Sequence, residues 1–408
     1  MNSGDTAWLL TSSALVLLMT PALAFFYGGM VRRKNLLSTI MMSFAILCMV
    51  SILWILYGYT MAFGPDAKGL VGNLSWFGLA GVGQDPSPVY ASTVPQLAFV
   101  AFQATFAIIT VALWTGAVVE RIKFGALLAF AALWFTLVYC PVAHWVWGSG
   151  GWLAQLGALD FAGGTVVHVN AGISALALAL VLGPRMGFKE GESMEPNNIP
   201  YVVLGAALLW FGWFGFNAGS ALTAGGLAAN AFITTNTAAA SAGFTWMILG
   251  WIHRRPSVLG AATGAVVGLV AITPAAGFVP VWAAIPIGAI GSIISYYVMV
   301  WRAKSSGVDE SLDVFACHGM GGTWGALATG IFATTAVNAS ASGLIDGNWK
   351  QVLIQALAIV ATAAYAFAIS WLLAKALKAT MGLRVKEEEE AVGLDISQHG
   401  ETAYGGVS

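Results

Sequence analysis

The chain has 408 residues, of which 58% are hydrophobic and only 9% carry a charged side chain. Soluble domains contain about 25% charged residues, so this composition excludes a soluble enzyme, a nucleic-acid-binding protein and a disordered scaffold. The formal net charge of -1 offers no basic surface for nucleic acid. A mean hydropathy of +0.80, 17 tryptophans and 49 glycines indicate an all-α polytopic membrane protein, because membrane helices are rich in glycine and tryptophan gathers at membrane interfaces.

Eleven apolar segments are long enough to cross a bilayer when about 20 residues are allowed for each span. The first segment lacks the basic start of a signal peptide, so we expect it to be retained. A long connection, residues 64–94, separates the second segment from the third. The predicted spans cover approximately residues 7–31, 37–63, 95–119, 124–147, 163–184, 199–218, 230–252, 257–275, 281–301, 314–336 and 351–374.

The positive charges predict the orientation of these spans. Of the 17 lysines and arginines, 15 lie in the odd-numbered connections or after the last span, and only Lys68 and Lys350 lie elsewhere. Positive residues collect on the cytoplasmic side, so we expect the N-terminus outside a cell membrane and the C-terminus inside. Residues 1–374 then form a transmembrane domain and residues 375–408 a cytoplasmic tail, in which we interpret the Glu387–Glu390 run as a solvated patch.

Two sets of five spans, about residues 7–184 and 199–336, are expected to form an inverted repeat, with the eleventh helix, about 351–374, outside it. An odd number of spans in each set turns one copy upside down relative to the other. The fifth span begins near Asp160 and carries His168, and the tenth begins near Asp313 and carries His318. We interpret both aspartates as helix N-caps, with direct cation binding by Asp160 as the alternative.

His168 and His318 are the strongest functional candidates, because ionisable residues inside membrane helices are costly and usually mark a functional path. Counting from Asp160 and Asp313 places them about 12 and about 7 Å inside opposite faces. Two neutral imidazoles in contact can pass a proton, whereas two separate structural histidines are the alternative. No Asp, Glu, Lys or Arg falls in the middle of a predicted span, so we expect a substrate that crosses without charge. We expect no metal, because no third ligand accompanies the histidines.

Aromatic residues gather at the outer ends of three predicted spans. Phe102 and Phe106 are four residues apart and share one helical face, and Trp147 ends the fourth span on the same side. Aromatic faces bind small cations with about 0.5 to 2 kcal/mol, so the cluster predicts a cation site, with an interfacial aromatic belt as the alternative. We interpret the neighbouring His144 as structural. The sixth span adds Trp213, Phe214, Phe216, Asn217 and Ser220.

Several stretches resemble the ammonium transporter branch of the ammonium transporter and Rhesus protein family. They are FFYGGMVRRKN, AFQATFAIIT, ALDFAGGTVVHVNAG, WFGFNAGSA, VGLVAITPAAG, DVFACHGMGG and the tail GLRVKEEEEAVGLDISQHGETAY. The resemblance covers essentially the whole chain. It implies that residues 1–374 form a transport domain of eleven helices with a five-plus-five inverted repeat. It also implies that the protein assembles as a homotrimer with one pore per subunit.

The resemblance also implies roles for single residues. It implies a substrate-binding site at Trp147, Phe102, Phe106 and Ser220, a gate at Phe106 and Phe216, a twin-histidine proton relay at His168 and His318, and structural support from Asp160 and Trp213. The expected substrates are ammonium and methylammonium. The tail resembles a segment that contacts PII signalling proteins, and neither a cofactor nor enzymatic activity is expected.

We therefore expect an ammonium transporter that binds NH4+ outside, deprotonates it and conducts ammonia through an apolar pore, with net charge movement. A Rhesus-like channel for neutral ammonia is one alternative. An ammonium sensor without useful flux is another, and it would need a separate partner on the tail.

Overall fold

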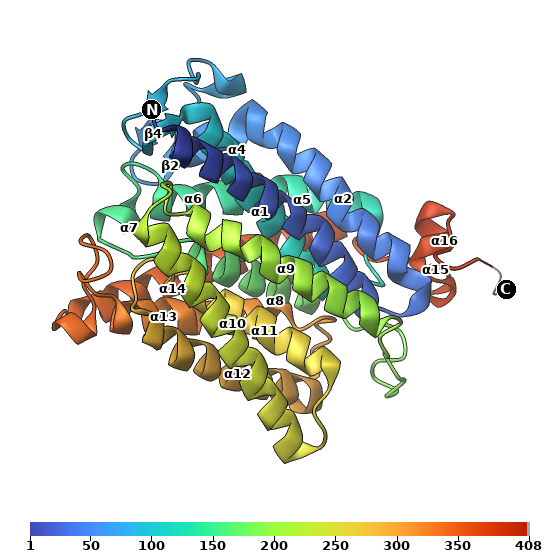
Figure 1. Ribbon diagram of the computed structural model, residues 1–408. Helices are drawn as coiled ribbons and strands as arrows, with labels where there is room; N and C mark the ends of the chain where they lie inside the picture. Colours follow the sequence, from blue (N-terminus) through green and yellow to red (C-terminus); the bar gives the residue numbers. More distant parts are fainter. Residues whose placement is uncertain (406–408) are drawn as a thin grey trace.

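The computed structural model describes residues 1–405, which form a bundle of long helices (Figure 1). Each predicted span coincides with a helix or with a run of helical segments. The first five comprise α1 (Ser3–Met30); α2 (Leu36–Leu53), η2 (Trp54–Gly58) and α3 (Tyr59–Phe63); α4 (Gln96–Leu113) and η4 (Trp114–Ala117); α5 (Phe124–Trp134), η5 (Phe135–Tyr139) and α6 (Cys140–Trp147); and η6 (Gly164–Val169) and α8 (Asn170–Leu182).

The remaining six predicted spans follow the same chain order. They comprise α9 (Ile199–Gly219); α10 (Gly226–His253); α11 (Val258–Ile272); η7 (Val281–Ala283), α12 (Ala284–Trp301) and η8 (Arg302–Ser306); η9 (Phe315–Met320) and α13 (Gly321–Phe332); and α14 (Lys350–Thr380). In the part of the chain that the structure describes, eight helical segments are long and apolar enough to cross a membrane. Helix α11 has only 15 residues, and α10 and η9 with α13 are less apolar, so eleven crossings stay a prediction.

The two ends of the bundle differ in structure. One end, which we call the loop end, is where α1 begins, and it carries the paired strands β1 (Asp66–Ala67) with β2 (Val71–Gly72) and β3 (Pro86–Ser87) with β4 (Ala91–Pro95) (Figure 1). The short helices η3 (Phe77–Leu79), α7 (Trp152–Gln155) and η10 (Leu344–Asp346) lie in the connections of this end. Residues 64–94 are therefore a structured cover.

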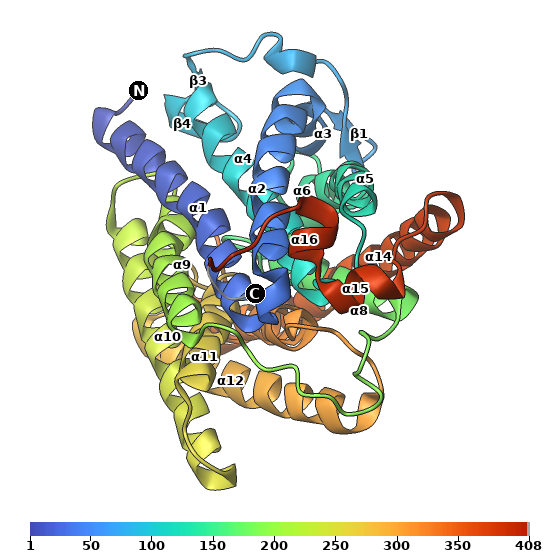
Figure 2. The ribbon, with the colours of Figure 1, turned by 90° about the vertical axis from the view of Figure 1, so that its right-hand side faces the viewer.

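The opposite end, which we call the tail end, carries the C-terminal segment. Helices α15 (Glu387–Val392) and α16 (Leu394–His399) lie at this end, and α16 packs beside α2 and η1 (Arg33–Asn35) (Figure 2). Helix α14 continues to Thr380, beyond the predicted end at 374, because residues 375–380 include the strong helix formers alanine, leucine and lysine. The predicted tail begins correspondingly later, and its last three positions, 406–408, lie outside the described residues.

Glycines allow the helices of the bundle to approach closely. A Cβ atom at Gly205 would lie 2.4 Å from the backbone nitrogen of Phe26, and one at Gly172 would lie 2.1 Å from that of Gly319. Small residues at helix interfaces permit such contacts in membrane bundles, where packing replaces the hydrophobic drive between helices. The second contact joins α8, which continues the helix of His168, to η9, which carries His318.

Candidate functional site

The aromatic residues predicted at the outer ends of the spans lie together at the loop end. The ring centroids of Phe102 and Phe106 are 4.9 Å apart in an edge-to-face arrangement, and those of Phe106 and Trp147 are 5.9 Å apart. Phe102 packs against the Cα of Gly219, because a Cβ there would lie 2.8 Å from its ring. The neighbouring Ser220 hydroxyl donates to the Phe216 carbonyl at 2.8 Å. Helices α4, α6 and α9 thus supply one cluster.

Phe106 and Phe216 form the deepest layer of this cluster. Their rings stack with centroids 4.2 Å apart and an interplanar angle of 24°, and both side chains are buried. Phe214, two residues earlier on α9, instead stacks on Phe232 of α10 at 4.0 Å and does not belong to the cluster. Phe216 also stacks on His168, with ring centroids 6.1 Å apart, so the pair connects Trp147 to the histidines.

Asp160 supports this region through the backbone. Its carboxylate accepts the amides of Gly163, Gly164 and Thr165 at 2.7, 2.6 and 2.8 Å, and the Val166 amide at 3.2 Å. The Thr165 hydroxyl donates to the same carboxylate at 2.5 Å. The Asp160 carboxylate therefore caps the start of η6, as expected, although Gly163 occupies the N-cap position itself, and its oxygens are occupied by protein donors.

Trp147 is held by the same segment that Asp160 organises. The indole Nε1 of Trp147 donates to the backbone carbonyl of Asp160 at 2.9 Å. This bond connects the end of α6 to the start of η6, which carries His168. A displacement of either segment therefore changes the position of the indole ring over Phe106.

His168 and His318 are in direct contact, with their Nδ1 atoms 3.2 Å apart. Both are buried, at 1% and 4% exposure. The ring of His168 also stacks on Trp213 at 5.5 Å, and the Trp213 indole donates to the Thr273 hydroxyl at 2.9 Å. One Nδ1 donates to the other, so a neutral pair leaves one Nε2 as a donor and one as an acceptor.

A small cavity of about 10 Å³ lies between Phe216 and the two histidines, about the space that one water-sized molecule needs. No charged side chain lines it. Its walls are formed by Met19, Leu23, Phe26, Ile109, Leu113, Val167, His168, Leu209, Trp213, Phe216, Val266 and His318. A second cavity, of about 680 Å³, adjoins His318 and is lined by charged groups that include Arg302, Lys304 and Asp313.

The sequence interpretation of Asp313 as a helix cap is wrong. The Glu310 carboxylate caps this segment by accepting the amides of Val314 and Phe315 at 3.0 and 3.2 Å. Asp313 has a φ of 58° and pairs with Arg302 at 2.7 Å. Glu310 precedes His318 by the same number of residues that separates Asp160 from His168. The segment of Glu310 and His318 therefore corresponds to the segment of Asp160 and His168 more closely than the predicted match between Asp313 and Asp160.

Each histidine lies on a π-helical segment, His168 on η6 and His318 on η9. Such segments are rare in proteins and occur frequently at functional sites, and η2, η5 and η8 of this chain are π-helical as well. The pattern of apolar residues does not distinguish a π-helical turn from an α-helical one. The sequence therefore offered no signal for this feature.

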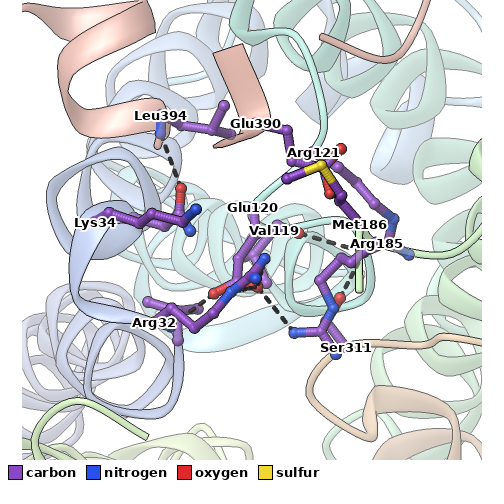
Figure 3. A network of polar contacts seen from close by, with 12 residues as sticks. Arg32, Lys34, Val119, Glu120, Arg121, Arg185, Met186, Ser311, Glu390 and Leu394 are labelled. Carbon is purple, nitrogen blue, oxygen red and sulfur yellow. Dashed lines mark hydrogen bonds and ion pairs between the residues drawn. The ribbon is translucent and has the colours of Figure 1, made fainter. Parts of the chain in front are cut away.

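A charged network lies buried at the tail end (Figure 3). The Glu120 carboxylate binds Arg32 and Arg185, each at 3.0 Å, and Asp309 binds Arg185 at 2.8 Å. Burial raises the pKa of Glu120, but the two arginines outweigh it and leave the pKa below its usual value. Paired in this way, the charges tie the connections of several helices together.

The tail docks on this network through Glu390. Glu390 is fully buried, pairs with Arg384 at 2.7 Å and accepts the Met186 amide at 2.6 Å (Figure 3). The interpretation of the Glu387–Glu390 run as a solvated patch is therefore wrong for this residue. Sequence cannot show that one glutamate of four points inward when its partners come from other segments.

A second tail contact involves the start of α2. The Asp395 carboxylate accepts the amides of Leu37 and Ser38 at 3.0 and 2.7 Å, and the Leu394 amide donates to the Asn35 side chain at 2.8 Å. Asp395 thus supplies the cap that no residue adjacent to α2 provides. Docking of the tail completes a helix of the bundle.

Comparisons with known proteins agree along the whole chain. The model of the Ammonium Transporter Family matches residues 7–404. An ammonium transporter of Bacillus subtilis is 52% identical, with 99% of each chain covered, and the ammonium transporter Amt1 of Archaeoglobus fulgidus is 52% identical, with 99% of this chain and 100% of that one covered.

Solved structures show the same architecture. The crystal structure of Candida albicans Mep2 has a TM-score of 0.90 at 37% identity and covers 99% of this chain and 90% of that one. A structure described as a sensor Amt protein has a TM-score of 0.90 at 31% identity and covers 97% of this chain and 98% of that one.

Proposed function

This chain belongs to the ammonium transporter family, and we propose that it binds ammonium at the aromatic cluster, removes a proton and conducts ammonia past the two histidines. It is a multi-pass protein of the cell membrane, and its family consists of transporters rather than enzymes. The small apolar cavity beside His168 and His318 is the observation that carries the mechanism.

The aromatic cluster has the chemistry of an ammonium site. The faces of Trp147, Phe102 and Phe106 attract a small cation with about 0.5 to 2 kcal/mol. The Ser220 hydroxyl donates its only hydrogen to the Phe216 carbonyl. Towards any other group it can therefore act only as an acceptor, through its lone pairs. It can therefore accept an N–H bond from ammonium, which a potassium ion does not offer.

Deprotonation follows from what lies below the Phe106 and Phe216 gate. An ion entering the small cavity would lose its water and meet no counter-charge, at a cost of several kcal/mol or more. Ammonia is neutral and close to water in size, so it fits the space without this penalty. The substrate therefore leaves its proton before it crosses.

The histidine pair supplies a route for that proton. The Nδ1 to Nδ1 bond of His168 and His318 joins two groups that both donate and accept. A proton accepted at one end of the pair is matched by a proton released at the other. Ammonia and the proton then cross separately, and transport is electrogenic overall.

The remaining assignments complete the proposal. The loop end faces outward and the tail end faces the cytoplasm, in agreement with the positive-inside rule. The protein is a homotrimer of eleven-helix subunits with an inverted repeat and contacts membrane lipid along its outer faces. Methylammonium is a slower substrate, Asp160 and Trp213 are supporting residues, and the tail is a docking surface for a PII signalling protein.

The test is the current that an ammonium jump evokes from the purified protein in liposomes on a solid-supported membrane. We expect a sustained ammonium current, a smaller methylammonium current and none with potassium. Ammonia flux without current would identify a Rhesus-like neutral channel. Ammonium binding with neither flux nor current would favour a sensor, the description of one structural relative. A potassium current equal to the ammonium current would refute the deprotonation step.

A further inference from the structure

The position of Ser220 depends on how α9 ends, because Ser220 is the first residue after that helix. The Ala218 carbonyl accepts the Ala221 amide at 3.3 Å, and the Gly219 carbonyl accepts the Leu222 amide at 2.9 Å. Leu222 has a φ of 58°, a left-handed conformation that is unfavourable for a large side chain. Such a conformation persists only where surrounding contacts hold it, so the turn after Ser220 needs support from outside α9.

Helix α1 provides a first support through Trp8. The Trp8 indole donates to the Ala218 carbonyl at 3.2 Å, across 210 positions of the chain. Trp8 and Ala221 also pack against one buried cluster, which includes Ala218 and Ala228. A carbonyl oxygen has two lone pairs, and here one bond comes from the turn of α9 itself and the other from α1. The carbonyl two residues before Ser220 is thus fixed from two sides.

The first turn of α1 provides a second support through Asp5. Oδ1 of Asp5 accepts the Ala224 amide at 2.8 Å, two residues after the unfavourable conformation of Leu222. Asp5 itself is buried, at 8% exposure. Trp8 and Asp5 therefore hold the chain on both sides of the turn that follows Ser220.

Helix α1 is also attached to the aromatic side of the site. The Asn2 amide donates to the Thr93 carbonyl at 2.6 Å, and α4, which carries Phe102, follows the strand of Thr93 directly. Ser12 borders both sides, since a Cβ at Gly219 would lie 2.6 Å from the Cβ of Ser12 and 2.8 Å from the Phe102 ring. Helix α1 thus sets the spacing between this ring and the end of α9.

We propose that Trp8 and Asp5 are positioning residues for the ammonium site, which hold the end of α9 so that the Ser220 hydroxyl faces the cation with its lone pairs. This inference rests on the proposed role of Ser220. The two side chains contact the backbone at residues 218 and 224, so they act through Ser220 and not on the cation. They should therefore change the affinity for ammonium and leave the maximal rate of transport unchanged.

The experiment measures the half-saturating concentration of ammonium and the maximal current in liposomes. Ser220→Ala should raise the half-saturating concentration about 2-fold to 10-fold, the change expected for the loss of one hydrogen bond. Trp8→Phe keeps an aromatic ring but removes the indole N–H, so it should give part of this rise at an unchanged maximal current. Trp282→Phe is the matched control, because Trp282 is an exposed tryptophan at the loop end that packs on Phe332.

A double variant tests whether Trp8 acts through Ser220. In a Ser220→Ala background, Trp8→Phe should cause no further rise, because the group that it positions is gone. Effects that multiply in the double variant would show that Trp8 acts elsewhere and would overturn the proposal. A wild-type half-saturating concentration in Trp8→Phe would overturn it as well.

Variants of Asp5 separate its hydrogen bond from its charge. An asparagine side chain keeps a carbonyl oxygen that accepts the Ala224 amide, so Asp5→Asn should stay close to the wild type, whereas Asp5→Ala should raise the half-saturating concentration. Equal rises in both would assign the effect to the negative charge and contradict a positioning role. Asp346→Asn is the control for external charge, because Asp346 is bonded to Thr334 and Thr335.

Amide hydrogen exchange of residues 220–224 gives a readout that needs no transport. Protection should be lower in Trp8→Phe and Asp5→Ala than in the wild type, and unchanged protection in folded variants would refute the positioning role. If Asp5→Ala does not fold, the more conservative Trp8→Phe decides. Lower protection together with a wild-type half-saturating concentration in Ser220→Ala would instead refute the role of Ser220, on which the proposal depends, and not the contacts.

Discussion

Replacing Gly172 by alanine should disrupt the histidine pair without touching either histidine. The new Cβ would lie 2.1 Å from the backbone nitrogen of Gly319 and 2.4 Å from its Cα, and neither atom can rotate away. Ordinary contact begins at 3.4 Å, so α8 and η9 must separate locally by about 1.3 Å.

That separation is large compared with a hydrogen bond. Carried in full to His168 and His318, it would lengthen their 3.2 Å contact to about 4.5 Å, beyond hydrogen-bond range. Overpacking of this kind typically costs about 1 to 3 kcal/mol of the free energy of unfolding. We therefore expect a folded but less stable variant whose ammonium-evoked current falls sharply.

Two further alanine variants make the comparison specific. At Gly319 the nearest atom to a new Cβ is Cδ2 of Phe315, at 3.1 Å, so Gly319→Ala should be the milder change. Gly243→Ala, on α10, meets the Ala261 carbonyl and two atoms of Ala265 at ordinary contact distances of 3.4 to 3.5 Å and is the matched control. Thermal unfolding in detergent and liposome currents measure both effects. Wild-type stability and current in Gly172→Ala would refute the reasoning.

Three more predictions concern the ends of the bundle. Trp147→Leu should raise the half-saturating ammonium concentration about 2-fold to 30-fold, the equivalent of 0.5 to 2 kcal/mol; an unchanged value in a folded protein would remove the indole from the site. Burial and the neighbouring Asp313 raise the pKa of Glu310 to about 7, so its contribution to stability is present at acid pH and lost as the pH rises towards 7. In thermal unfolding experiments, Glu310→Gln should reduce this loss of stability with rising pH. Parallel curves of stability against pH for the variant and the wild type would contradict this prediction. Glu390→Gln should weaken the Arg384 ion pair and make the tail accessible to added protease. A variant that resists the protease as well as the wild type does would contradict this prediction.

The residues that sequence identified best are those whose local surroundings are unusual. His168 and His318 stood out because each lies in an apolar stretch, where a polar side chain is costly and needs a partner. Phe102 and Phe106 stood out because a four-residue spacing fixes a common helical face. Phe216 was also placed in the aromatic cluster from the residue pattern, but its pairing with Phe106 came from family resemblance.

Two residues that sequence placed wrongly, Asp313 and Glu390, have partners that the local pattern does not reveal. Asp313 is a residue type that commonly caps helices, but its carboxylate binds Arg302, and the Glu310 carboxylate accepts the Val314 amide instead. The sequence predicts that Glu390 is one of four solvated glutamates, but in the structure its carboxylate accepts the amide of Met186, which is 204 residues away. The interpretation of His144 as structural agrees with its contacts, but only the fold shows that Asp66 lies at its Nε2.

The π-helical turns that carry the histidines have a consequence for insertions and deletions. A π-helical turn holds one residue more than an α-helical turn, so each of η6 and η9 is equivalent to a one-residue insertion in a regular helix. Deleting a single residue from either turn would restore ordinary α-helical hydrogen bonding and rotate one side of the turn by about 100° relative to the other. The histidine on that turn would then leave its partner. At these two turns, regular α-helical hydrogen bonding and contact between the two histidines therefore exclude each other.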